Sequence, residues 1–242
     1  MEEKMKKIVV ALALATVFLL CTITAQAIPV SYGTATHSTT AWQELATYEN
    51  GSETNTFGVF WSVDGGAWGQ DTDLYVGQDV QFKFNMHKEN VGTHYADFLK
   101  SWLDWGQDGS FDDPADVIAF GYQELLTNET GNLGSWNTPN VSDYTFFSNT
   151  FTLMDDDIGD LYLRARVTCS HSLADSMGSG WGDQWSIDAA AYNSGFNPTG
   201  WLHQGEVEEW KIVVNPVPEP ATMLLLGTGL IGLAGLRRRF KK

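Results

Sequence analysis

The chain has 242 residues and a formal net charge of −16. Its two ends are basic, so residues 28–216 between them are more acidic, with 27 acidic and 6 basic side chains and a net charge of −21. A surface of that sign repels nucleic acid and anionic lipid, which argues against nucleic-acid binding as the function. Cys169 is the only cysteine in this segment, so it cannot contain an internal disulfide.

Residues 1–27 have the pattern of a secretory signal peptide. Lys4, Lys6 and Lys7 precede an apolar stretch over residues 8–21, and Ala25 and Ala27 occupy positions −3 and −1 of a cleavage site. We expect this segment to direct export and to be cleaved after Ala27. An uncleaved N-terminal anchor helix is the alternative.

Period-two alternation of apolar and polar residues recurs along the central segment, while long stretches of helical period are missing from the sequence. Short strands separated by clusters of Gly, Asn and Asp are typical of all-β domains. We therefore predict one exported domain over residues 28–215, an Ig-like or jelly-roll-type β-sandwich. The expected strands are 57–63, 80–86, 95–103, 117–120, 144–153, 161–167 and 210–214.

An acidic loop follows the third of these strands. Its aspartates at 104, 108 and 112 fall at positions 1, 5 and 9 of an EF-hand-like loop, with Gly109 at position 6. Gly106 and Ala115 depart from that pattern at positions 3 and 12, so the loop is not an EF-hand. We predict a relaxed calcium site, against the alternative of a solvated turn rich in Asp and Gly. The candidate ligands are Asp104, Asp108, Ser110, Asp112, Asp113 and Asp116.

The segment 170–204 contains Gly, Ser and several aromatic residues, and it is predicted to be a long loop. Exposed tryptophan rings stack on sugars, so Trp181, Trp185 and Trp201 are candidate glycan-binding residues. In the alternative interpretation these rings close the open end of the sandwich.

Three motifs in order resemble a GEVED domain over about residues 98–214. They are the acidic loop at 103–113, the sequence LYLRARV at 161–167 and the sequence GEVEEW at 205–210. The resemblance implies an extracellular β-sandwich of secreted, often adhesive, proteins, and it implies no known catalysis. The sequence departs from the family at Gly106, and it has Glu209 and Trp210 where the family has Asp and Tyr.

Glu206 and Glu208 of the third motif have a structural interpretation. We expect them to pair with Arg164 or Arg166 on a neighbouring strand, where such a pair would contribute ~0.2–1 kcal/mol.

Residues 216–242 read as a second signal. The apolar stretch 221–236 would reach about 24 Å as a helix, short of the ~30 Å hydrocarbon core of a bilayer. The basic tail 237–242 would stay on the cytoplasmic side. This order gives a topology in which the domain is exported and the membrane holds its C-terminal end.

The same residues resemble the PEP-CTERM sorting signal of Gram-negative bacteria. The resemblance lies in Val217, Pro218, Glu219 and Pro220, in the short helix 221–236, and in the arginines Arg237, Arg238 and Arg239. It implies recognition by an exosortase, a membrane cysteine protease-transpeptidase that cuts near the triplet, so that the apolar tail is an address rather than a final anchor. A simple single-span anchor is the alternative.

These observations together predict a non-catalytic exported protein. It would start as an inner-membrane-tethered precursor and end at the cell surface or in the extracellular matrix. There it would act in adhesion or in a biofilm or exopolysaccharide matrix, with Ca²⁺ as its cofactor and extracellular polysaccharide as a partner. A carbohydrate-binding module that uses segment 170–204 is the second hypothesis. A secreted hydrolase is the third, although the sequence has neither an H-E-x-x-H nor a G-x-S-x-G motif.

Overall fold

The computed structural model describes residues 28–40, 43–49, 52–70, 73–88, 96–124, 142–179 and 188–217. Within these ranges most of the ordered elements are β-strands, which confirms the all-β prediction. The predicted terminal helices, over residues 1–27 and 221–236, lie outside the described residues.

A four-stranded sheet forms one layer of the domain. Its central strand is β7 (Asp79–Lys88), which pairs along one edge with β10 (Ser142–Thr152). Along its other edge β7 pairs with β5 (Val59–Val63) and then with β2 (Gln43–Leu45). All three pairings are antiparallel. Because β5 pairs with residues 80–84 of β7 and β2 with residues 86–88, these two strands lie one after the other along the same edge.

A five-stranded sheet forms the second layer. Its order is β6 (Asp73–Tyr75), β13 (Glu206–Asn215), β11 (Gly159–Cys169), β8 (Ala96–Leu103) and β9 (Val117–Glu124). All neighbours are antiparallel except β6 and β13. A small hairpin of β3 (Thr47–Glu49) and β4 (Ser52–Asn55) stands apart from both sheets.

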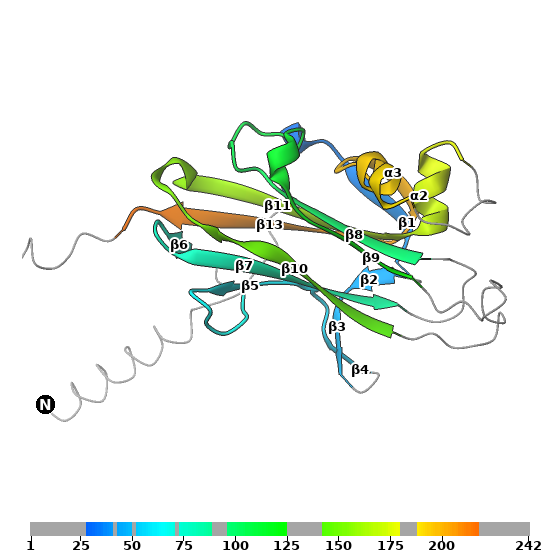
Figure 1. Ribbon diagram of the computed structural model, residues 1–242, viewed down its shortest axis with the longest axis horizontal. Helices are drawn as coiled ribbons and strands as arrows, with labels where there is room; N and C mark the ends of the chain where they lie inside the picture. Colours follow the sequence, from blue (N-terminus) through cyan, green and yellow to red (C-terminus); the bar gives the residue numbers. More distant parts are fainter. Residues whose placement is uncertain are drawn as a thin grey trace, which may run out of the picture.

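The main core lies between the two sheets (Figure 1). On β7 the residues Val80, Phe82, Phe84 and Met86 are buried, as their alternation predicts. They belong to the same cluster as buried residues of β8, β11 and β13. Each of these side chains contributes about 1.5–3 kcal/mol through burial. The packing of the two layers therefore follows from the alternating pattern of the strands.

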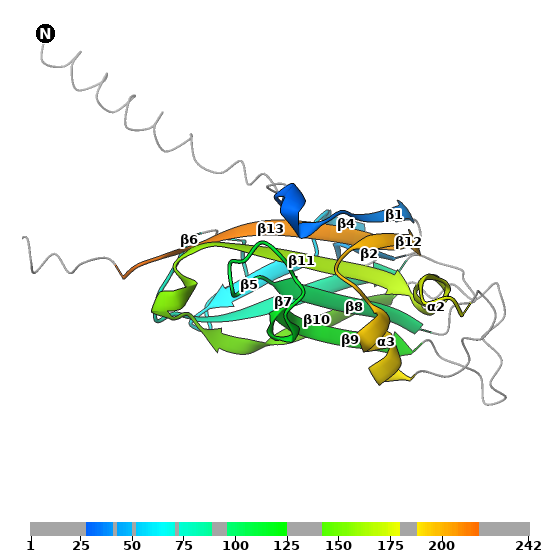
Figure 2. The same ribbon diagram turned by 90° about the horizontal axis from the view of Figure 1, so that it is seen from above.

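A second core covers the outer face of the five-stranded sheet. Every residue of β8 is buried, because segments from both ends of the chain pack on the side that faces away from the main core. These segments are η1 (Val30–Tyr32), β1 (Ala35–Thr39), α2 (Ser170–Ser176), α3 (Ala189–Gly195) and β12 (Gly200–Gln204). Figure 2 shows the two helices beside the strands at one end of the domain.

The prediction that residues 170–204 form a long loop is therefore wrong for the described parts of that segment. They contain α2, α3 and β12, and β12 pairs in parallel with β1. Each helix has seven residues, too few for a helical period to show in the sequence. Helices this short owe their stability to tertiary packing, here on the second core.

Gly58 marks a close approach between strands. A Cβ atom at this position would lie 2.3 Å from the carbonyl oxygen of Asn85 and 2.7 Å from the carbonyl carbon of Leu45. Only glycine fits here, and the buried amide of Gly58 donates to the side chain of Glu208 from the opposite sheet.

Candidate functional site

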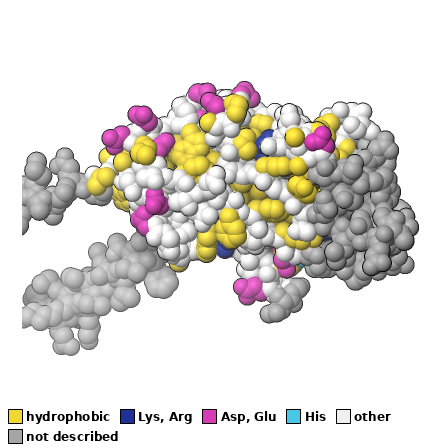
Figure 3. Space-filling model, in the orientation of Figure 1, with side chains coloured by type: hydrophobic (Ala, Val, Ile, Leu, Met, Phe, Trp, Pro, Cys, Tyr) yellow, Lys and Arg dark blue, Asp and Glu magenta, His cyan; other side chains and the backbone are white. Residues whose placement is uncertain are grey.

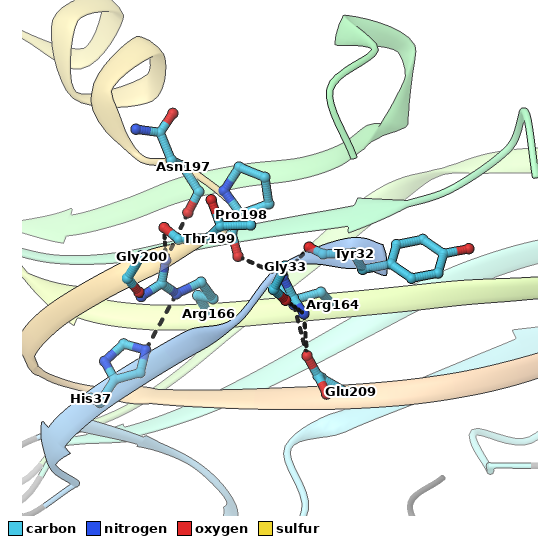
Figure 4. Close-up of polar contacts among 10 residues, drawn as sticks. All are labelled: Tyr32, Gly33, His37, Arg164, Arg166, Asn197, Pro198, Thr199, Gly200 and Glu209. Carbon is cyan, nitrogen blue, oxygen red and sulfur yellow. Dashed lines mark hydrogen bonds and ion pairs between the residues drawn. The ribbon is translucent and has the colours of Figure 1, made fainter. Parts of the chain in front are cut away.

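Arg164 and Arg166 lie two residues apart on β11, so their side chains project from the same face, away from the main core (Figure 4). Arg164 is buried, and its Nε donates to Oε1 of Glu209 at 2.8 Å. Its Nη1 donates to the carbonyl of Pro198 at 2.9 Å, and its Nη2 to the carbonyl of Gly33 at 2.9 Å. The guanidinium group of Arg164 thus connects β11 to three other parts of the chain, namely β13, the segment that contains Gly33 and the segment that precedes β12.

Arg166 repeats the arrangement one step along the strand. Its Nη1 donates to the carbonyls of Asn197 (2.8 Å) and Thr199 (3.0 Å), and its Nη2 donates to the carbonyl of Gly200 (3.0 Å). Its Nε lies 3.3 Å from Nε2 of His37. Burial, and then the charge of Arg164, lower the pKa of Arg166 to about 9. The two arginines and their carbonyl partners, called the arginine clamp below, fasten the outer segments to the sheet.

The expected pairing of Glu206 or Glu208 with these arginines is wrong. The register of β11 and β13 places Arg164 opposite Glu209, and Glu209 forms the ion pair. Glu206 and Glu208 lie on the other face of β13, together with Trp210, because successive residues of a strand point to opposite sides. That face looks toward the four-stranded sheet.

Glu208 joins the two sheets through its carboxylate. It accepts hydrogen bonds from the amides of Gly58 (2.7 Å) and Val59 (3.3 Å) and from Nε1 of Trp210 (3.0 Å). Glu206 accepts one from the amide of Leu45 at 2.6 Å. Burial raises the pKa of Glu208 to about 8 and that of Glu206 to about 7, although the hydrogen bonds oppose the shift. Both side chains satisfy backbone amides at the junction of β2 and β5.

In the acidic loop, Asp104 is buried and accepts several hydrogen bonds. Its carboxylate receives the hydroxyl of Tyr32 at 2.6 Å, the amide of Gly109 at 3.0 Å and the amide of Asp108 at 3.3 Å. Asp116 is also buried and accepts from the amide of Trp105 at 3.3 Å. Its pKa rises to about 6, chiefly because of burial. These two buried carboxylates fix the conformation of the loop by accepting hydrogen bonds from its backbone amides.

The other predicted ligands lie at the surface of the loop. Asp108, Asp112 and Asp113 are exposed, and acidic side chains dot this face of the molecule (Figure 3). Asp108 accepts from the amide of Ser110 (2.9 Å), and Asp113 caps the turn η2 (Pro114–Asp116) by accepting from the amide of Ala115 (2.8 Å). Ser110 accepts from the amide of Asp112 at 3.3 Å.

These residues do not fit a calcium site in this conformation. Four of the five aspartates already accept hydrogen bonds from N–H or O–H groups of the protein, and the exposed ones do not converge on a common point. Among the described residues there is no group of three or more His, Cys, Asp or Glu side chains that could hold a metal ion. The arrangement favours the alternative of a solvated turn, and melting with and without calcium is the direct test of the site that the sequence predicts.

Of the predicted glycan-binding residues, Trp181 and Trp185 lie outside the described residues. Trp201 is on β12 and is 52% exposed. Its indole Nε1 donates to Oγ of Ser38 at 3.1 Å, and the His203 ring lies edge-on to it with the ring centroids 5.8 Å apart, so the ring is fixed in place and partly open to solvent. It is available for stacking, and its orientation is held by β1.

A second group of exposed aromatic rings was missed by the sequence reasoning. Phe60, Trp68 and Phe147 surround Lys83 on the outer face of the four-stranded sheet, and we call them the sheet-face aromatic cluster. Lys83 lies opposite Phe60 on β5 and opposite Phe147 on β10. Its Nζ is 5.0 Å from the ring centroids of both Phe60 and Trp68, and the rings of Trp68 and Phe147 are 5.6 Å apart.

Two of these rings are open to solvent, with Phe147 53% and Trp68 38% exposed. The alternation of β5 and β7 indicates that Phe60 and Lys83 point away from the core. The pairing of β10 with β7 adds Phe147, and the ring contacts place Trp68, from the β5–β6 connection, beside it.

Residues 216–239 match the model of the PEP-CTERM protein-sorting motif. This confirms the predicted sorting signal and implies an exported protein, sorted by an exosortase, whose precursor is anchored in the membrane. The match begins directly after β13 ends at Asn215, where Val217 is 60% exposed. The motif residues 218–220, the arginines 237–239 and the cleavage residues Ala25 and Ala27 lie outside the described residues.

No curated protein matches the chain. One similar solved structure is described as "AvmM Catalyzes Macrocyclization in Alchivemycin A Biosynthesis", and it aligns with 73% of this chain and 99% of its own at 10% identity and a TM-score of 0.27. A similarity of that size supports no statement on fold or function. The comparisons do not confirm the GEVED resemblance, which stays a prediction.

None of the helices within the described ranges is long and apolar enough to cross a membrane. The predicted span at 221–236 is not part of those ranges.

Proposed function

We propose that this protein is a non-catalytic surface or extracellular-matrix protein that acts in adhesion or in the assembly of a biofilm or exopolysaccharide matrix. The observation that carries the proposal is the position of the sorting motif, which starts one residue after the last strand of a folded β-domain. We also propose that the domain is an Ig-like or jelly-roll-type sandwich and that it is GEVED-like, which its three sequence motifs support.

The titratable groups support a structural role for the interior. Strongly shifted pKa values are frequent at catalytic sites, but structural networks cause them as well. Here Glu206, Glu208 and Asp116 have raised pKa values, and each accepts hydrogen bonds from backbone amides that need a partner. Burial raises these pKa values, and the carboxylates are buried where they serve as acceptors for these amides, which is a structural role.

The sorting step is tested with the full chain in a bacterium that carries an exosortase. We expect the wild-type protein to be shortened and to leave the membrane fraction. The triple variant Pro218→Ala, Glu219→Ala, Pro220→Ala should stay at full precursor length in the membrane. Met154→Ala, an exposed substitution outside the matched motif, should behave as wild type. Equal processing of the triple variant would contradict sorting through this motif.

Carbohydrate binding is a second candidate function, and the sheet-face aromatic cluster favours it. Aromatic faces on an exposed sheet can stack on sugar rings, and Lys83 places a hydrogen-bond donor between the rings. The cluster stands on paired strands, so binding would require little reordering.

This candidate is tested by calorimetry with the extracellular polysaccharide of the producing cells. Trp68→Ala and Phe147→Ala should each weaken binding by about tenfold, which corresponds to ~1.4 kcal/mol. Met154→Ala, which removes an equally exposed apolar side chain elsewhere, should leave binding unchanged. Unchanged binding in both aromatic variants would exclude this surface and direct attention to Trp201. Turnover of the polymer that is lost on one carboxylate substitution would instead support the hydrolase hypothesis.

A further inference from the structure

A polar cluster is buried between the two sheets, at the end of the domain where β7 stops and β8 starts. Lys88 is the last residue of β7, Asp97 is the second residue of β8, and Gln43 is the first residue of β2, directly opposite Lys88. All three residues have an exposure of 0%. Lys88 and Gln43 belong to one sheet and Asp97 to the other.

The polar atoms of this cluster lack ordinary partners. Among the described residues, no hydrogen bond reaches Nζ of Lys88, either carboxylate oxygen of Asp97, or the side-chain oxygen and nitrogen of Gln43. Lys88 Nζ lies 4.0 Å from Oδ2 of Asp97, longer than a hydrogen bond. Groups buried in this way normally find partners, because an unsatisfied buried polar atom is costly.

Burial drives both ionisable groups toward their uncharged forms. It lowers the pKa of Lys88 and raises the pKa of Asp97 to about 7, although each charge opposes the shift of the other. Gln43 approaches Asp97 closely enough to favour its ionised form, but this does not offset the burial. A neutral amine is a nucleophile, and a neutral carboxylic acid accepts its attack more readily than a carboxylate does.

We propose that Lys88 and Asp97 condense to an isopeptide bond that joins the two sheets covalently. The lone pair of Lys88 Nζ attacks Cγ of Asp97, and the C–N bond forms as the C–OH bond breaks. A proton from the nitrogen passes to the departing hydroxyl, which leaves as water. Neither group is oxidised or reduced, so the step needs no further reactant.

The fold supplies what this reaction lacks in solution. Lys88 and Asp97 face each other from strands that are each fixed in their own sheet, and such fixed orientation replaces a bimolecular encounter. Gln43 acts as a positioning residue, since its amide N–H groups can donate to the Asp97 oxygen that becomes negative during attack. The product replaces the unpartnered amine and acid by a single amide, and it links the sheets in a domain with a single cysteine.

An exposed pair in the same protein provides an internal control. Lys211 Nζ and Asp160 Oδ2 are closer, at 2.7 Å, but their side chains are 25% and 47% exposed. The pKa of Lys211 is raised, chiefly by its hydrogen bond with Asp160, so its amine stays protonated and is not a nucleophile. This pair should not condense, so burial rather than distance distinguishes the two sites.

The test is tryptic peptide mapping by mass spectrometry of the protein obtained by expressing the full chain. Trypsin cuts after lysine, so the free residues give peptides 84–88 and 89–100. An isopeptide bond blocks the cut at Lys88. We expect one peptide, 84–100, lighter than its sequence by one water molecule and without fragment ions from between residues 88 and 97. A cyclic imide at Asp97 would lose the same water but would leave Lys88 cleavable.

Substitutions at Asp97 distinguish a covalent bond from a pair that is buried but unreacted. Asp97→Ala should restore both peptides at full mass, whereas Asp97→Asn should give the same linked peptide as wild type by releasing ammonia instead of water. Asp160→Ala should leave the digest at Lys211 unchanged. Complete cleavage after Lys88 in the wild-type protein, with both peptides at full mass, would overturn the proposal whether or not any variant folds.

Discussion

The arginine clamp and the Lys88–Asp97 cluster are both buried groups of charged side chains, yet their surroundings are opposite. Arg164 and Arg166 lie on the outer face of the five-stranded sheet, under irregular segments whose carbonyls turn toward them. Lys88 and Asp97 lie between regular strands, whose backbone groups are occupied by the ladders. Two cations can therefore be equally buried and differ in stability. The one that is stabilised is the one with backbone carbonyls available to accept its hydrogen bonds.

The difference between the arginine and lysine side chains explains part of this contrast. A guanidinium group presents five N–H donors in a planar fork and keeps its charge when buried, while an ammonium group is compact and loses its proton more readily. The clamp suits arginine because several segments meet there. In the cluster, a lysine without carbonyl partners becomes a reactive amine.

The largest expected effect is the loss of stability in Arg166→Met. Removing this buried guanidinium eliminates three charge-assisted hydrogen bonds to carbonyl groups, so we expect the free energy of unfolding to fall by about 3–5 kcal/mol. Arg166→Lys should recover only part of this, because it restores the charge without the fork. Urea denaturation at pH 7 measures both. Lys211→Met, which breaks a surface pair, should cost less than ~1 kcal/mol. A loss of similar size in Lys211→Met and Arg166→Met would contradict the clamp.

The covalent link predicts a difference between two substitutions at one position. Asp97→Asn should keep the bond and match the wild-type stability, while Asp97→Ala should lower the free energy of unfolding by about 2–3 kcal/mol, the range expected for a cross-link that closes a short loop. Chemical denaturation followed by tryptophan fluorescence measures this. Equal stability of the two variants would mean that Asp97 acts only through burial.

Glu208 predicts a dependence of stability on pH. Its folded pKa, about 8, is above the ordinary value of 4.5, so the folded state binds more protons than the unfolded state between these values. Stability should therefore fall as the pH rises from about 5 to 8, and Glu206, with a pKa raised to about 7, adds in the same direction.

Glu208→Gln should flatten that profile by an amount on the order of 2 kcal/mol, because the amide does not titrate. Glu209→Gln is the matched control on the same strand, since Glu209 lies on the opposite face. Denaturation midpoints at several pH values test the prediction, and a profile as steep in Glu208→Gln as in the wild type would assign the pH dependence to other groups.

The smallest effect should come from calcium. The carboxylates of the acidic loop have donors within the protein, so we expect the melting temperature in millimolar calcium to equal that in EDTA. Asp104→Ala should lower stability by about 1–3 kcal/mol in both conditions, since it leaves the Tyr32 hydroxyl and the Gly109 amide without an acceptor. A rise in melting temperature with calcium that is lost in Asp104→Ala and Asp108→Ala would instead establish the metal site.

The sequence pattern predicts the positions of the central strands, but it does not predict which residues of neighbouring strands contact one another. The alternation in 80–86 and 161–167 predicts the central strands β7 and β11, since one face of each is buried by apolar residues. It also places Glu206 and Glu208 on the same face as Trp210. It does not reveal which residue of β11 lies opposite each glutamate, because that depends on register, and so the arginines were assigned the wrong partners.

The sorting function was determined by the sequence itself, because a triplet, an apolar stretch and a basic end are local features that act in order along the chain. The all-β class follows from a pattern of period two, which is equally local. Only the tertiary structure decided where the buried charges meet. Lys88 and Asp97 belong to different sheets, and the carbonyls around Arg164 and Arg166 come from segments more than 100 residues apart in sequence. Contacts of this kind depend on how layers pack and strands align, which no single stretch of sequence encodes.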